Sequence, residues 1–175
     1  MVNRKMWIKR SFMSLSIALG LALVSGCGSV NHSLSLLDNY TPQPRTKVEV
    51  GKVTNQTGKT FNIIDTEQTL ADAFVQVLRK QNLLATGEEG NRLVLGSRIV
   101  EYEKGSALQR WMLPGWGSTV LTIEGELTHG ERVVGTFQAR RTVSIGGTLT
   151  IGAWRTIFAS VAEDVAKDLR SKIPK

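Results

Sequence analysis

The first 26 residues constrain most strongly what this chain can fold into, because they divide into a charged head and an uncharged apolar stretch. The head holds four basic residues, Arg4, Lys5, Lys9 and Arg10. Residues 12–24 follow without a charged side chain, in the layout of a secretory signal peptide. A helix that spans a bilayer needs roughly 20 apolar residues, and this stretch is shorter. We therefore expect residues 1–26 to be a signal peptide that is removed.

The signal ends in Leu23-Val24-Ser25-Gly26-Cys27, which resembles the bacterial lipobox. In lipobox proteins a signal peptidase cuts before the cysteine, which carries diacylglycerol. Cys27 is the only cysteine, so no internal disulfide can form, and a free thiol is the alternative to lipidation. Acyl chains on Cys27 would supply more than the two signals that stable membrane anchoring needs. Gly28 in place of Asp resembles lipoproteins that Gram-negative bacteria pass on to the outer membrane.

The formal charge of +7 belongs to the whole chain, and four of its 22 basic residues leave with the signal. The remaining 18 face 15 acidic residues, a balance that demands neither nucleic acid nor an acidic substrate. We expect residues 27–46, which contain Pro42 and Pro44, to be a lipidated tether. Residues 47–175 are long enough to bury one core, so we expect a single periplasmic α+β domain there.

Alternating apolar residues predict four strands in this domain, at residues 47–53, 92–102, 119–128 and 133–143. In the second strand Leu93, Leu95 and Ile99 share one side, and Val94, Val100 and Tyr102 share the other, as in a central strand. The last two strands flank the turn His129-Gly130-Glu131 and should form an antiparallel hairpin in which Val133, Phe137, Ala139 and Val143 alternate.

Two stretches carry apolar residues at helical spacing. Asp65 is the expected N-cap of the first helix, which places Leu70 and Phe74 on one face and should end near Asn82. The second runs from Trp154 to Leu169 and closes at Pro174. These elements predict a two-layer α+β sandwich, with a mostly antiparallel sheet of about four strands and two helices packed on one face.

No pattern in the sequence indicates catalysis. His32 and His129 have no ligand-forming neighbours at metal-site spacing, so we expect solvated histidines and no metal. Glu124 and Glu126 share one face of an alternating strand, where they are explained as a polar outer face rather than an acid–base pair. No nucleophile motif or phosphate loop is present. We therefore expect no enzyme activity and no cofactor.

The segment Gly105–Ser118 is apolar where surface loops are usually polar. Its candidate binding residues are Arg110, Trp111, Met112, Leu113 and Trp116. Tryptophan, methionine and arginine are enriched where proteins bind partners, and tryptophan also at membrane interfaces. The segment either covers the core or forms an exposed contact site. The glycine-rich residues 144–152 are interpreted as a connector, or as a segment that packs against this loop.

Two stretches carry a family resemblance: Leu93-Val94-Leu95-Gly96-Ser97-Arg98-Ile99, and the Arg-Trp and Gly-x-Gly-Ser elements of residues 105–118. Together with the order of the predicted elements, they resemble the domain-of-unknown-function family numbered 4410. That family consists of mostly Gram-negative lipoproteins and implies no catalytic residues. More distantly, the chain is similar to periplasmic modules of the curli secretion lipoprotein, the penicillin-binding-protein activator lipoprotein and the Tol-system propeller protein. Those modules bind other envelope proteins, which is an analogy at the level of fold.

We therefore expect a non-enzymatic protein-interaction module, held at the outer membrane by lipid on Cys27 and facing the periplasm. Its expected partner is another envelope protein, bound through Arg110–Trp116. The alternative is a carrier of a small apolar or lipid ligand, with Trp111 and Trp116 lining a pocket. A closed cavity beside the loop would favour the carrier, and an exposed patch would favour the interaction module.

Overall fold

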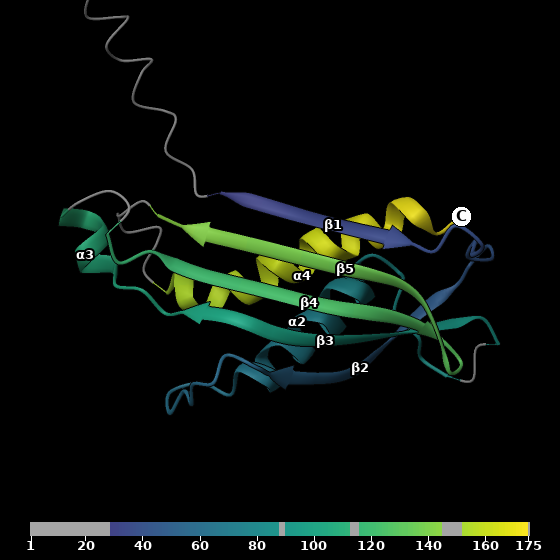
Figure 1. Cartoon of the computed structure of the whole chain (residues 1–175), viewed down its shortest axis with the longest axis horizontal. Helices are drawn as coiled ribbons and strands as arrows, with labels where there is room; N and C mark the ends of the chain where they lie inside the picture. Colours follow the sequence, from purple (N-terminus) through teal and green to yellow (C-terminus); the bar gives the residue numbers. More distant parts are fainter. Residues whose placement is uncertain (1–28, 88–89, 113–115, 145–151, 175) are drawn as a thin grey trace, which may run out of the picture.

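The structure is a computed structural model that describes residues 29–87, 90–112, 116–144 and 152–174. In this part, five strands form one sheet, accompanied by three helices (Figure 1). The strands are β1 (Val30–Leu36), β2 (Lys47–Asn55), β3 (Arg92–Glu103), β4 (Thr119–His129) and β5 (Arg132–Val143). The helices are α2 (Thr66–Lys80), α3 (Ala107–Met112) and α4 (Ala153–Lys172).

The sheet has the order β1-β5-β4-β3-β2, and its neighbours are antiparallel except for the parallel pair β2 and β3. Helices α2 and α4 contact each other and cover the same face, whereas α3 lies beyond one end of the sheet (Figure 1). The α+β class and the two layers are confirmed. The expected sheet of about four strands is wrong by one strand, and β2 and β3 are parallel because α2 carries the chain back across the sheet.

Helix α2 begins as the sequence predicts. The Asp65 carboxylate accepts a hydrogen bond from the backbone N–H of Gln68 at 2.9 Å, which satisfies a donor that the first turn leaves unpaired. Leu70 and Phe74 on its apolar face are fully buried against the sheet. The helix ends at a Gln81 cap, and Asn82 then takes a left-handed conformation with φ 57°.

The hairpin of β4 and β5 is also confirmed, but a bulge changes which residues of β5 reach the core. The register shifts between Leu127 and Thr128, so Val134 occupies the extra position and is buried. Val133, which the simple alternation placed with Phe137, is exposed instead. The sequence pattern has no marker for the bulge, because both candidate residues are valine.

A second bulge, between Ile99 and Glu101, corrects the expected facing of β3. Strict alternation placed Tyr102 opposite Ile99, but the extra residue turns the Tyr102 ring into the core, where it is 1 % exposed. Its ring centroid lies 5.1 Å from that of Phe158 on α4. The Tyr102 hydroxyl donates to the Trp154 carbonyl oxygen at 2.9 Å. Burial raises the pKa of Tyr102 to about 12.

Strand β1 lies within residues 27–46, where a tether was expected. It pairs along its length with β5, and Leu34 is buried in the core. The His32 Nδ1 lies 2.8 Å from an Asp168 carboxylate oxygen on α4, so the expectation of a solvated histidine is wrong at this position. Pro42 and Pro44 fall after the strand and do not interrupt it.

The opposite face of the sheet is polar, and no helix of the described residues covers it (Figure 1). Glu124 accepts from Arg98 at 3.0 Å, and Glu101 accepts from Arg140 at 3.2 Å. This pattern agrees with the interpretation of Glu124 as part of a polar outer face. Glu126 is exposed on the same strand.

Candidate functional site: an apolar tip at one end of the sheet

The loop between β3 and β4 projects beyond the end of the sheet and carries helix α3. Its base is closed by two hydrogen bonds. The Ser106 N–H donates to the Gly117 carbonyl oxygen at 2.8 Å, and the Thr119 hydroxyl donates to the Lys104 carbonyl oxygen at 2.8 Å. Gly105 has a positive φ of 63°, and a side chain there would collide with the backbone at Gly117. The base of the loop, at residues 104–106 and 117–119, is therefore fixed.

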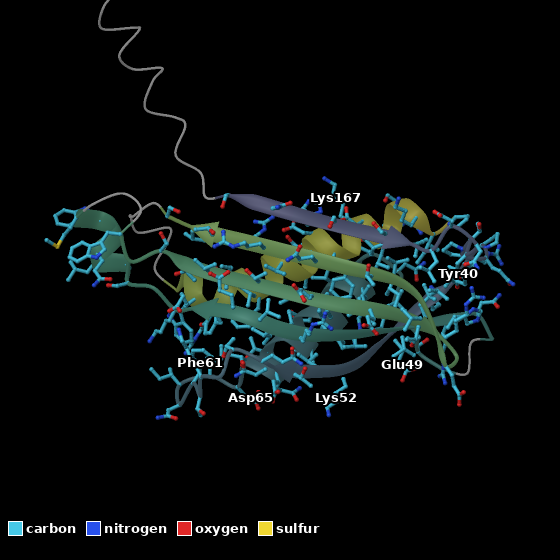
Figure 2. All side chains as sticks on the ribbon, in the orientation of Figure 1. Tyr40, Glu49, Lys52, Phe61, Asp65 and Lys167 are labelled. Atoms are coloured by element: carbon cyan, nitrogen blue, oxygen red, sulfur yellow. The ribbon has the colours of Figure 1, made fainter. Side chains whose placement is uncertain are left out.

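Four large apolar side chains on this projection are exposed, and we call them the apolar tip. Their exposed fractions are 66 % for Leu108, 73 % for Trp111, 59 % for Met112 and 49 % for Trp116. Side chains extend from α3 away from the sheet (Figure 2). The alternative that this loop covers the core does not hold for these residues. Leu113 lies outside the described residues, and the Arg110 side chain is not described.

The polypeptide enters the domain at the same end of the sheet. The Thr142 N–H donates to the Ser29 carbonyl oxygen at 3.0 Å, and Val30 pairs with Arg141. The next residue of β5, Val143, pairs with Thr119, where β4 leaves the tip. The N-terminal end of β1 and the tip therefore lie at one end of the molecule, while the chain ends at the other (Figure 1).

Two basic side chains, Lys104 at the base of the loop and Arg155 in the first turn of α4, lie against the ring of Trp154. The Lys104 ammonium lies 4.8 Å from the centroid of the Trp154 ring, and the Arg155 guanidinium carbon lies 4.5 Å from it. Such cation–π contacts hold both cations near the aromatic ring. Phe61, labelled at this end in Figure 2, packs against Tyr102 with ring centroids 4.8 Å apart. The base of the tip is thus aromatic and cationic.

Two cavities lie elsewhere. One, of about 310 Å³, is lined by Arg45, Lys47, Leu83 and Arg170 among others, near the C-terminal ends of α2 and α4. The other, of about 300 Å³, is an open hollow on the polar face between Ser33, Arg98 and Glu126. Neither is lined by a residue of the apolar tip.

Within the described residues, no three His, Cys, Asp or Glu side chains gather as a metal site. His129 lies beside Tyr40, and the Tyr40 hydroxyl is 3.4 Å from the His129 Nδ1.

Among the described residues, none of the helices combines the length and the apolar character that a membrane span needs.

One charged contact that the sequence analysis missed joins α4 to β5. Arg141 donates to both carboxylate oxygens of Asp164, at 2.6 and 2.8 Å. These hydrogen bonds raise the pKa of Arg141 above its ordinary value. Asp164 is almost fully buried and falls among the apolar residues of α4, so its position in that stripe was a signal that it has a buried partner.

The family model described as Domain of unknown function (DUF4410) matches residues 52–147, more than half of the chain. This chain belongs to the DUF4410 family. The resemblance seen in the sequence is therefore confirmed. A comparison of this DUF4410 chain with curated proteins finds no match.

Two solved structures are similar to the DUF4410 chain. The PelC dodecamer from Paraburkholderia phytofirmans, 18 % identical, aligns with a TM-score of 0.56 over 85 % of this chain and 99 % of that chain. A protein from Xanthomonas campestris assigned to DUF330 is 16 % identical, with a TM-score of 0.45, over 77 % of this chain and 89 % of that chain. At this identity the PelC likeness shows the fold alone.

Proposed function

We propose that this DUF4410 chain is a lipid-anchored, non-enzymatic interaction module of the Gram-negative cell envelope. Residues 1–26 are removed, Cys27 carries the lipid, and the domain faces the periplasm from the outer membrane. It acts by surface contact, with another envelope protein as its partner. The charged head, apolar stretch and lipobox support the anchor.

The observation that carries the contact function is the apolar tip. Two tryptophans, a methionine and a leucine are about half exposed or more on a loop whose base is closed by hydrogen bonds. Exposed apolar groups gathered in this way mark surfaces that meet another surface. Trp111 and Trp116 contribute little to the core, and their exposure supports a contact outside the chain. The surface that the apolar tip contacts depends on the position of the tip relative to the lipid on Cys27.

One partner of this kind is a further copy of the same chain. Support for this comes from the shared fold with PelC, which was solved as a dodecamer. In the described residues β1 has a strand on one side only, whereas residues 83–85 hydrogen-bond to Val48 along the outer edge of β2. An edge strand such as β1 can pair with a neighbouring chain.

The experiment is crosslinking of the full chain in Gram-negative cells, followed by separation of the membranes and identification of the adducts. We expect the chain in the outer-membrane fraction, with protein adducts and with a Cys27 that mass spectrometry shows to carry diacylglycerol on its thiol and an acyl chain on its amine. Cys27→Ala is the matched control, which should accumulate as unprocessed precursor and lose both lipid and adducts. A chain with equal lipid label in both forms, or without adducts when acylated, would contradict the proposal.

A further inference from the structure

We propose that the apolar tip lies in the interface of the bilayer that carries the Cys27 lipid, and that it orients the domain on that membrane. This inference rests on the proposed acylation of Cys27. It makes the surface that the apolar tip meets a lipid surface, and it leaves the protein partner of the proposed function to the free edge of β1.

The first argument is the length of chain between the anchor and the fold. Cys27 precedes Ser29 by two residues, and an extended chain advances at most about 3.3–3.6 Å per residue. Ser29 is fixed by the hydrogen bond from Thr142. The lipid-bearing residue is therefore held within about 7 Å of Ser29, not at the end of a long tether.

The second argument is that the tip leaves the sheet at this same end. Ser29 contacts Thr142 of β5, and Val143 pairs with Thr119, the first residue of β4 after the tip. A domain anchored by so short a link has this end of its sheet at the bilayer surface. Helix α3 lies at this end of the sheet (Figure 1), so its exposed side chains then face the lipid that anchors the chain.

The third argument is the chemistry of the tip and its base. Tryptophan concentrates at the level of lipid headgroups, and leucine and methionine enter the apolar layer beneath. Lys104 and Arg155 lie beside Trp154 at the base of the tip, where cations attract anionic headgroups. An apolar tip with cationic side chains at its base is suited to a bilayer interface.

The test uses the acylated mature chain, purified from membranes and placed in vesicles of phosphatidylethanolamine and phosphatidylglycerol, with and without brominated acyl chains. Bromine quenches tryptophan that lies in the lipid. Trp116→Phe with Trp154→Phe leaves Trp111 as the sole tryptophan of the mature chain. We expect Trp111 to lose most of its emission in brominated vesicles and to resist aqueous iodide.

The matched control moves the reporter to the other end of the hairpin. Val133 is exposed beside the β4–β5 turn, and Val133→Trp with all three native tryptophans changed to Phe should be quenched by iodide and not by bromine. A second measurement needs no substitution: hydrogen exchange of the α3 amides should slow in vesicles relative to detergent.

Trp111 emission that is equal in both vesicle types and open to iodide, with α3 exchange unchanged, would overturn the membrane contact. A Trp111 shielded from both quenchers would overturn it in favour of a protein-bound tip. Both results leave the proposed function standing if Cys27 is acylated. A chain without acyl groups on Cys27 would instead overturn the proposed function, and this inference with it.

Discussion

Gly125 marks a point in β4 where the sheet has no room for a side chain. A Cβ atom built there would overlap the ring of Phe137 and the carbonyl oxygen of Gly96. Gly125→Ala should therefore lower the free energy of unfolding by about 1–3 kcal/mol, as overpacking does. Urea unfolding of the wild type and the variant measures the change.

Gly96 on β3 is the matched control, since a Cβ there would meet its nearest atoms only at 4.0 Å. Gly96→Ala should be neutral or slightly stabilising because it restricts the unfolded chain. Equal losses at both glycines would show that strand flexibility, and not the Phe137 ring, decides the effect.

The pair of Arg141 and Asp164 should contribute more to stability than the pairs on the outer face. Asp164→Ala leaves a partly buried guanidinium without its partner, and we expect a loss of about 3 kcal/mol. Glu124→Ala, which breaks the more exposed pair with Arg98, should lose less than about 1 kcal/mol. Chemical denaturation compares the two, and a reversed order would contradict the assignment of Asp164 as the buried partner.

Protonation of Glu101 should make the free energy of unfolding depend on pH. The hydroxyl of Thr122 donates to its carboxylate at 2.6 Å, and this bond, with Arg140, holds the pKa of Glu101 below its ordinary value. A lowered folded pKa means that the stabilisation is complete above the ordinary carboxyl pKa and is lost as the pH falls through the folded value.

An NMR titration of the Glu101 carboxyl checks this directly. Thr122→Val should move its pKa upward, toward the ordinary value, because the largest cause of the lowering is removed. Thr122→Ser keeps the hydroxyl and should keep the low pKa. A titration unchanged by Thr122→Val would show that the hydroxyl does not stabilise the carboxylate.

Strand β1 should behave as part of the domain and not as a tether. Leu34 is buried between the sheet and the helices, so Leu34→Ala should lower the unfolding free energy by about 2 kcal/mol or more. Leu37, just past the strand, is exposed, and Leu37→Ala should change nothing. Thermal melting measures both variants. Superimposable curves for Leu34→Ala and the wild type would show that residues 30–36 belong to a tether and not to the folded domain.

The elements that the sequence predicts well are those whose signals are local. An Asx cap and an apolar stripe specify α2, and a turn between alternating strands specifies the hairpin. Strand β1 has the same local signal, since His32, Leu34 and Leu36 alternate with polar residues, but the nearby prolines favoured a tether. The parallel pairing of β2 with β3 and the two bulges are set by tertiary packing, so no local pattern predicts them.

For the site, residue types alone select the apolar tip as a candidate, but they leave open whether Trp111 and Trp116 are exposed. Exposure depends on the closed base of the loop between Ser106 and Gly117. The position of the tip beside Ser29 depends on β1 pairing with β5, which joins distant parts of the sequence. Composition therefore identifies the site, and only topology places it at the end where the chain enters.

At the scale of the whole molecule, the tip should be dispensable for folding. Changing both Trp111 and Trp116 to Ser should leave the thermal midpoint nearly unchanged, because substitutions of exposed side chains have small effects. Phe158→Ala, at a fully buried site on α4, should cost about 3–5 kcal/mol in the same assay. A large loss from the tryptophan changes would show that the tip supports the core.

The pairing of β1 with β5 also sets an order of events. Val30 pairs with Arg141, which is far away in the sequence, and contacts between such distant residues form slowly because the chain loses entropy before the contacts are made. The strands β2 to β5 connect through nearer neighbours, so we expect β1 to dock last. If Cys27 is already in the membrane, that last step draws the folded body down onto the lipid. If β1 detached, residues 28–46 would become a flexible linker. The rest of the domain would then leave the membrane surface without unfolding.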